Sequence, residues 1–126
     1  MPFPRLACAT LAAMCVNYTP ATRQHLQEMF NAPVQPHLEW PAETYPDYAA
    51  PIILSTDDGK RETLVANFGM IPKVHLPASA KHFSTMNARS ETVSTLRSYA
   101  QAWKKGQFCL VPCKDFFEPN WETGRR

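Results

Sequence analysis

Hydrophobic and polar positions are most clearly ordered between residues 51 and 68. Two apolar, strand-forming runs, PIILST at 51–56 and TLVANF at 63–68, flank the polar segment DDGK at 57–60. An Asp-Gly pair between two such runs is a strong signal for a β-hairpin. We therefore predict two antiparallel strands joined by a tight turn at this place in the chain.

Two other segments have apolar residues at helical spacing. Thr19 and Pro20 supply a capping hydroxyl and a first-turn proline, so we predict that they open a helix, and residues 31–33 (NAP) end it. Residues 90–105 are predicted to form a second helix, which ends at Gly106 as C-cap. The apolar face of this second helix comprises Leu96, Tyr99, Ala100 and Trp103.

The remaining segments favour loops and one more strand. Residues 33–51 hold five prolines among aromatic residues and are predicted to form an ordered irregular loop, while residues 108–117 are predicted to form a strand that Pro112 interrupts. A length of 126 residues fits one domain. The predicted fold class is thus a β-rich α+β single domain with two main helices and Pro-rich loops.

Charge and hydropathy narrow the class of protein. Apolar runs fall far short of the ~20 residues that a membrane-spanning helix needs, which excludes an integral membrane protein of that kind. The whole chain has a net charge of +2, but residues 73–105 hold six Lys and Arg against one acid, Glu91, a local net of +5 that leaves −3 for the rest. Such a block indicates a face for a polyanion, or else a solvated helix surface.

The two ends of the sequence differ from its middle. Residues 1–13 are either a weak secretion-type leader or the product of a start site placed upstream of the true one, Met14. The chain stops soon after the strand predicted at 108–117, where an open sheet edge needs a partner. We therefore expect residues 14–126 to be the N-terminal part of a longer domain.

Four cysteines are present, Cys8, Cys15, Cys109 and Cys113. Structural zinc prefers tight pairs on glycine-bearing turns, and no glycine lies between Cys109 and Cys113, so we predict no metal and no cofactor. A small, buried, hydrophobic role is predicted for both of these residues. A disulfide framework would require secretion, for which the leader is weak.

Cys15 has a distinct chemical possibility. If translation starts at Met14 and that methionine is removed, Cys15 carries an α-amine with a pKa of about 8 next to a thiol with a pKa of about 8.5. The amine can add to an aldehyde to give an imine, and the thiolate can then close a five-membered thiazolidine. The alternative is that Cys15 is an ordinary buried cysteine, and a start at Met1 would leave its nitrogen an unreactive amide.

The segment that holds Cys15 and three further segments carry a family resemblance: residues 14–18 (MCVNY), 67–72 (NFGMIP), 87–92 (NARSET) and 109–118 (CLVPCKDFFE) occur in this order. Together they resemble the SOS response-associated peptidase (SRAP) family, the abasic-site processing proteins. The resemblance extends over residues 14–124 and implies the SRAP-like β-rich domain. It also implies an enzyme that crosslinks itself to abasic sites in single-stranded DNA, with lyase-type and autoproteolytic peptidase chemistry as further possibilities.

The resemblance implies roles for individual residues. Cys15 would be the covalent nucleophile, Asn87 would hydrogen-bond at the abasic sugar, and Glu118 would stabilise that sugar and move protons. Arg89 and Arg97 would hold the flanking phosphates. Taken alone, Asn87 is equally compatible with a helix cap, Glu118 with a solvated acid at a strand end, and Arg97 with a surface charge.

The sequence also departs from the family pattern. Val16 and Asn17 stand where a Gly-Arg pair is frequent, so a phosphate-binding arginine is replaced, and Asn17 becomes the candidate DNA contact there. The usual aromatic after the Gly-x-x-Pro segment is absent from residues 73–75, and the frequent Asn before the Ala-Pro at 50–51 is lost. None of the four histidines matches the motif of the family's catalytic histidine. They are His25, His37, His75 and His82.

Three hypotheses follow from the sequence. The first is an abasic-site crosslinking enzyme of the cytoplasm and nucleoid, expected to be a monomer, with damaged single-stranded DNA as its partner and no membrane association. The second is a non-catalytic single-strand DNA-binding module with a masked nucleophile. The third is an inactive fragment that does not fold cooperatively.

Overall fold

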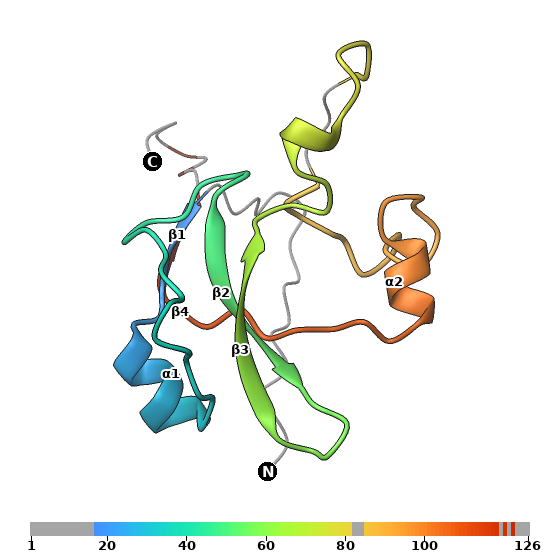
Figure 1. Cartoon of the computed structure of the whole chain (residues 1–126). Coiled ribbons are helices and arrows are strands. Elements are labelled where there is room, and N and C mark those ends of the chain that lie inside the picture. The colour runs from blue at the N-terminus through green and yellow to red at the C-terminus, as the bar shows by residue number, and fades with distance from the viewer. Residues whose placement is uncertain (1–16, 82–84, 119, 121, 123–126) are drawn as a thin grey trace.

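The structure is a computed structural model that describes residues 17–81, 85–118, 120 and 122. Two antiparallel two-stranded sheets, β2–β3 and β1–β4, form its frame, with two short α-helices and long connections around them (Figure 1). The predicted β-rich α+β class is therefore confirmed. In chain order the elements are β1 (Asn17–Pro20), α1 (Arg23–Phe30), β2 (Ala49–Ser55), β3 (Arg61–Asn67), the 3-10 helix η1 (Lys73–His75), α2 (Ala100–Lys104) and β4 (Cys113–Phe117).

The β2–β3 hairpin matches the prediction from its local sequence. The register runs without a break from Ala49 opposite Asn67 to Ser55 opposite Arg61. Gly59 has a φ of 77°, which the tight turn requires and which residues other than glycine rarely adopt. The Gly59 amide donates to the Thr56 carbonyl at 3.0 Å, so the turn has its own hydrogen bond. Among the described residues, no helix is long and apolar enough to cross a membrane.

The first helix begins later than predicted. Thr19 and Pro20 belong to β1, which pairs with β4 from Asn17 opposite Phe117 onward, so the prediction that they open the helix is wrong. The capping hydroxyl comes from Thr22, which accepts from the His25 amide at 3.3 Å. Pairing with a strand about 100 residues away thus overrides the local helix-start signal.

The end of α1 agrees with the prediction. Asn31 is the C-cap in the left-handed region, with a φ of 48°, and its amide donates to the Leu26 carbonyl. Asparagine tolerates this conformation better than most residues, because its short polar side chain can bond locally. Leu26 is fully buried, whereas Met29, also at helical spacing, is largely exposed. The helix therefore packs through a narrow apolar stripe.

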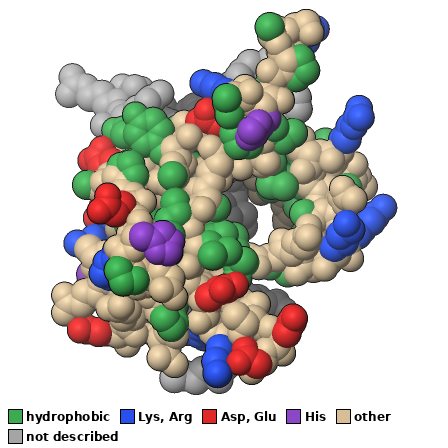
Figure 2. All heavy atoms as spheres, viewed as in Figure 1, with side chains coloured by type: hydrophobic (Ala, Val, Ile, Leu, Met, Phe, Trp, Pro, Cys, Tyr) green, Lys and Arg blue, Asp and Glu red, His purple; other side chains and the backbone are tan. Residues whose placement is uncertain are grey.

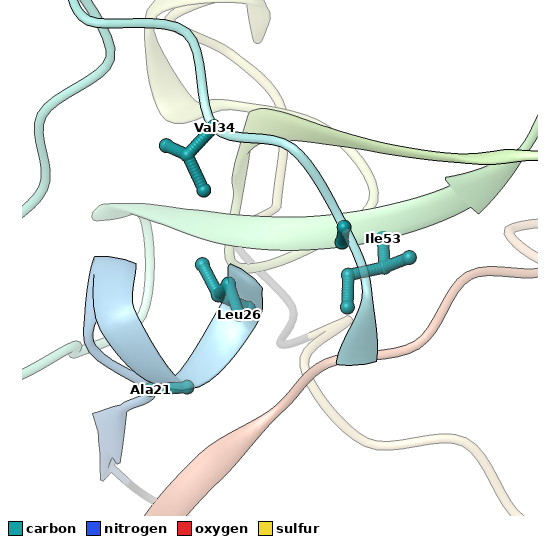
Figure 3. Close-up of a cluster of buried hydrophobic side chains, with 5 residues drawn as sticks. Ala21, Leu26, Val34 and Ile53 are labelled. Carbon is teal, nitrogen blue, oxygen red and sulfur yellow. The ribbon is translucent and has the colours of Figure 1, made fainter. Parts of the chain in front are cut away.

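The hydrophobic core is small and lies between α1, the Pro-rich loop and β2. Arg23 fastens the loop to the helix, because its guanidinium donates to the carbonyls of Val34, Gln35 and Leu38 at 2.6–3.3 Å. Trp40 donates to the Ala21 carbonyl at 3.2 Å, so the predicted irregular loop is ordered by side-chain contacts. Figure 3 shows this core, whose buried members are Ala21, Leu26, Ala32, Val34 and Ile53.

The second helix is much shorter than predicted. Only Ala100–Lys104 is α-helical, and residues 90–99 form a series of turns, so the prediction is wrong for the first ten residues. Hydroxyl and β-branched residues in this stretch compete with helical hydrogen bonding, as where the Thr95 hydroxyl donates to the Thr92 carbonyl at 3.1 Å. The predicted apolar face is not buried either, since Leu96 and Trp103 are about half exposed.

The last strand is also shorter than predicted. β4 covers Cys113–Phe117, and before Pro112 the chain pairs with the β2–β3 sheet at an isolated bridge between Leu110 and Ile53. All five residues of β4 are exposed. Cys109 and Cys113 are exposed free thiols, which corrects the prediction that they are buried.

Candidate nucleic-acid interface

The turns that precede α2 enclose a cavity of about 440 Å³. Three of the predicted site residues meet there: Asn87, which is partly buried, and Arg89 and Arg97, which are exposed. The other lining side chains are mostly hydroxyl-bearing. We call this site the Asn87 cavity; the rest of its lining is Thr85, Thr92, Leu96, Ser98 and Tyr99.

Local hydrogen bonds give the Asn87 cavity its shape. The Arg89 carbonyl accepts from the amides of Thr92 at 3.1 Å and Val93 at 2.8 Å, which turns the chain directly after Asn87. The Tyr99 hydroxyl donates to the Asn87 carbonyl at 2.9 Å and so ties the start of α2 to the Asn87 segment. The two ends of the cavity wall, 12 residues apart, are therefore held together.

Thr85, which lines the cavity, contacts the segment that follows β3. The Thr85 hydroxyl accepts from the Met70 amide at 2.8 Å, which brings the segment after β3 against the cavity. Gly69 has a φ of 135°, which only glycine adopts readily, and a Cβ there would lie 3.4 Å from the Thr85 hydroxyl oxygen. Glycine is therefore favoured at position 69 by the backbone conformation, since the distance to Thr85 is close to ordinary van der Waals contact.

The electrostatics of the cavity favour an anion. Within the described residues, neither Arg89 nor Arg97 has an ion-pair partner; the ion pair present joins Lys60 to Asp58 at the hairpin tip. On the face in Figure 2, Lys and Arg project from the side that holds α2 without acids beside them, whereas over α1 and at the hairpin tip Lys and Arg lie among acids. Two uncompensated guanidiniums beside hydroxyls and an amide make a suitable surface for phosphate oxygens.

The other predicted site residues lie at a different place. Asn17 begins β1 and is opposite Phe117, so Glu118, the next residue, is at the same end of the β1–β4 ladder. Glu118 is exposed, and neither it nor Asn17 is among the described residues that line the Asn87 cavity. Figure 1 shows β1–β4 and α2 on opposite sides of the β2–β3 hairpin in that view. Cys15 lies outside the described residues.

Four ionisable groups among the described residues have perturbed pKa values. Hydrogen bonds from the Thr56 side chain and from Lys60 lower the pKa of the Asp58 carboxylate at the hairpin tip. Partial burial raises the pKa of the Tyr99 hydroxyl, which keeps it protonated as the donor to Asn87. Desolvation also raises the pKa of the Cys109 thiol, and desolvation together with the nearby Asp115 carboxylate raises that of Cys113. Raised pKa values make both thiols weak nucleophiles near neutral pH. In the part of the chain that the structure describes, no group of three His, Cys, Asp or Glu residues is placed to hold a metal.

Comparison with known proteins identifies the family. Residues 14–126 of the chain match the family sequence model described as "SOS response associated peptidase (SRAP)". The chain belongs to the SRAP family. A sequence search of curated proteins gives no match.

A solved structure gives the same fold. The chain is similar to a protein from Bordetella bronchiseptica known from a crystal structure, with 33% sequence identity and a TM-score of 0.72. The match covers 88% of this chain and 54% of the Bordetella chain. This chain therefore spans about half the length of that relative.

The sequence alone did not identify all of the cavity. Tyr99 is brought to Asn87 by a hydrogen bond across 12 residues, and Thr85, two positions before Asn87, is held by a hydrogen bond from Met70, 15 positions earlier. The sequence prediction placed Tyr99 on the apolar face of a helix and therefore gave no reason to expect that its hydroxyl donates a hydrogen bond to Asn87. The hydroxyl-rich composition of residues 85–99 is the signal that was available.

Proposed function

We propose that this SRAP-family chain binds single-stranded DNA at the Asn87 cavity and captures abasic sites covalently through Cys15. The observation that carries the proposal is the meeting of Asn87, Arg89 and Arg97 at one cavity of about 440 Å³. An abasic site lacks its base, so a polar cavity next to phosphate-binding arginines suits the exposed sugar. Family membership supports DNA as the partner.

The role of each cavity residue follows from its chemistry. Arg89 and Arg97 hold backbone phosphates on either side of the lesion, and their lack of an acidic partner among the described residues supports this role. The Asn87 amide can donate to, and accept from, the sugar hydroxyls. Thr92 and Ser98 supply further hydroxyls at the wall.

The covalent step uses an amine and a thiol on one residue. The free α-amine of Cys15 adds to the aldehyde carbon of the ring-opened sugar, and loss of water gives an imine. The thiolate then attacks the imine carbon, the nitrogen takes up a proton, and a thiazolidine ring is closed with one water released overall. Glu118 serves as the proton carrier. Cys15 precedes Asn17 by two residues in the sequence, and Asn17 shares a ladder end with Glu118.

The decisive experiment measures adduct formation. The chain made from Met14, so that Cys15 becomes the N-terminus, is incubated with single-stranded DNA that carries one abasic site, and the products are separated under denaturing conditions. We expect a heat-stable adduct that is absent with undamaged DNA. Cys15→Ala abolishes it, whereas the matched exposed-thiol variants Cys109→Ala and Cys113→Ala keep it. If Cys109→Ala or Cys113→Ala abolishes the adduct while Cys15→Ala keeps it, the nucleophile is that other cysteine and the proposal is wrong.

Non-covalent binding of single-stranded DNA is the second candidate function. The observation in its favour is that Asn17 and Glu118 do not line the Asn87 cavity, so phosphate contacts there need no covalent step. Under this function, the chain made from Met1 and the chain made from Met14 bind equally well and neither forms an adduct. We propose peptidase activity only for one reaction, in which the chain removes its own residues before Cys15. An intact mass beginning at Cys15 tests that step.

A further inference from the structure

Two exposed aromatic rings lie together at the C-terminal end of α2. Trp103 and Phe108 are 47% and 60% exposed, and their ring centroids are 5.3 Å apart at an interplanar angle of 70°. In such an edge-to-face pair, one ring meets the other only by its edge, so the faces of that first ring stay clear of its partner. We call Trp103 and Phe108 the α2 aromatic pair. Its exposed faces are suited to stacking with another flat ring.

A tight turn after α2 brings the two rings together. Gly106 has a φ of 65°, and its amide donates to the Trp103 carbonyl at 3.1 Å. The Gln107 amide then donates to the Ala102 carbonyl at 3.0 Å, and the Phe108 amide donates to that of Gly106 at 3.0 Å. These hydrogen bonds turn the chain back toward α2. The backbone therefore holds the two rings next to each other before any ligand binds.

Basic side chains flank the α2 aromatic pair. Lys104 and Lys105 are exposed, and neither has an ion-pair partner among the residues that the structure describes. No Asp or Glu occurs between residues 92 and 114 of the sequence. Lysines at the end of a helix also suit the helix dipole, but uncompensated lysines beside exposed rings form the kind of surface that binds a single-stranded nucleic acid. Charge and aromatic character thus favour the same class of ligand.

A second exposed aromatic pair shows what the charges add. Tyr45 and Tyr48 are 40% and 48% exposed, and their ring centroids are 5.5 Å apart at an interplanar angle of 65°. The Tyr45 hydroxyl donates to the Glu43 carboxylate at 2.9 Å, and Asp47 lies between the two tyrosines in the sequence. These acids repel phosphates. The two pairs therefore have similar geometry and exposure, but only the α2 aromatic pair adjoins positive charge.

The α2 aromatic pair is also close to the Asn87 cavity. Tyr99 lines that cavity and directly precedes α2, and its carbonyl accepts from the Trp103 amide at 2.9 Å. One helical turn, with a pitch of about 5.4 Å, separates the backbone of these two residues. We propose that a base of the DNA strand held at the Asn87 cavity stacks on the α2 aromatic pair, and that the adjacent lysines contact its phosphates. This inference rests on the proposed DNA binding, but not on Cys15.

The test measures how much the bases next to a lesion contribute to affinity. Two oligonucleotides of equal length are compared with the full 126-residue chain by fluorescence anisotropy. One carries a single central tetrahydrofuran residue, a stable abasic analogue without an aldehyde, between normal bases; the other carries this analogue at every position. Both strands have the same phosphates. We expect the unmodified chain to bind the strand with bases about tenfold more tightly, because only that strand can stack.

Variants of the α2 aromatic pair locate this preference. Trp103→Ala is expected to reduce it to less than about twofold, whereas Trp103→Phe retains a ring and keeps most of it. The matched control Tyr48→Leu, in the second aromatic pair, leaves it unchanged. Lys104→Ala instead weakens binding of both strands and lowers the slope of log affinity against log salt by about 0.7, a slope that Trp103→Ala does not change.

Three results overturn the proposal, and one of them also overturns the proposed function. If the unmodified chain binds neither strand, both the stacking and the DNA binding are wrong. If it binds both strands equally, DNA binding stands and the stacking is wrong; this measurement needs no variant. If Trp103→Ala keeps the preference, the base stacks elsewhere. Sedimentation that shows a dimer broken by Trp103→Ala would assign the rings to a contact between copies of this chain, and thermal melts check that each variant is folded.

Discussion

Residues 17–67 and residues 70–117 differ in how many of their residues are buried. In the first region lie the buried core, α1 and the β2–β3 hairpin; in the second, Pro112 is the one buried position among the described residues. The second region nevertheless holds the Asn87 cavity and most of the exposed large apolar side chains of the described residues. Burial and candidate function are thus separated along the chain, as expected when loops on a stable scaffold carry binding residues.

The difference concerns what holds each region in place. The first region is stabilised by apolar packing around Leu26 and by the Arg23 guanidinium that joins helix and loop. The second is shaped by single hydrogen bonds, such as those from the Tyr99 hydroxyl and to the Thr85 hydroxyl. Single hydrogen bonds contribute roughly 0.5–1.5 kcal/mol each, so this region is expected to open more easily than the core.

The largest predicted effect tests this contrast directly. Leu26→Ala is expected to lower the free energy of unfolding by about 2–5 kcal/mol, because it leaves a cavity in the core where Leu26 is fully buried. Leu96→Ala, at a half-exposed position in the second region, is expected to lower it by only about 0.5 kcal/mol. Urea denaturation followed by circular dichroism measures both values. Equal losses would show that Leu96 belongs to a packed core.

Much of the fold was predictable because its signals are local. The β2–β3 hairpin and the end of α1 at Asn31 depend on residues that are neighbours in sequence, and both predictions are confirmed. The strand at Asn17–Pro20 was missed because its partner, β4, lies about 100 residues away. The helix predicted over residues 90–105 is wrong for residues 90–99, where hydroxyl and β-branched residues favour turns, and its predicted apolar face stays about half exposed at Leu96 and Trp103.

The candidate site also has one part that the sequence predicts and another that depends on pairing between distant strands. Asn87 and Arg89 belong to the 87–92 motif and Arg97 follows it; all three were predicted from the family resemblance, and they do meet at one cavity. The placement of Glu118 and Asn17 at a separate ladder end depends on strand register, which a short motif does not encode. The roles of all five remain predictions.

The next largest effect concerns DNA affinity. Arg89→Ala and Arg97→Ala are each expected to weaken binding of single-stranded DNA about tenfold, because each removes a charged contact to a phosphate. The slope of log affinity against log salt should fall by about 0.7 for each arginine removed. Fluorescence anisotropy with a labelled oligonucleotide at several salt concentrations measures both quantities.

A matched lysine makes this prediction specific. Lys60 is also basic and exposed, but it pairs with Asp58 at the hairpin tip, in the first region. Lys60→Ala should leave DNA affinity and the salt slope unchanged within error. If this variant weakens binding as much as the arginine variants do, the contact is general electrostatic attraction and the Asn87 cavity has no particular part in it.

The smallest predicted effect concerns the hydrogen bond that shapes the cavity. Tyr99→Phe removes the donor to the Asn87 carbonyl and is expected to lower the free energy of unfolding by about 1 kcal/mol, with a two- to fivefold loss of DNA affinity as Asn87 becomes less well placed. Because burial raises the pKa of Tyr99 in the folded state, its contribution to stability is fully present below the unfolded pKa of about 10 and declines as pH rises above that value. The stability difference between the unmodified chain and Tyr99→Phe should therefore be constant from pH 6 to 9 and shrink above pH 10. A difference that stays constant to pH 11 would mean that Tyr99 contributes through packing of its ring, and the Asn87 segment would then need another explanation for its position.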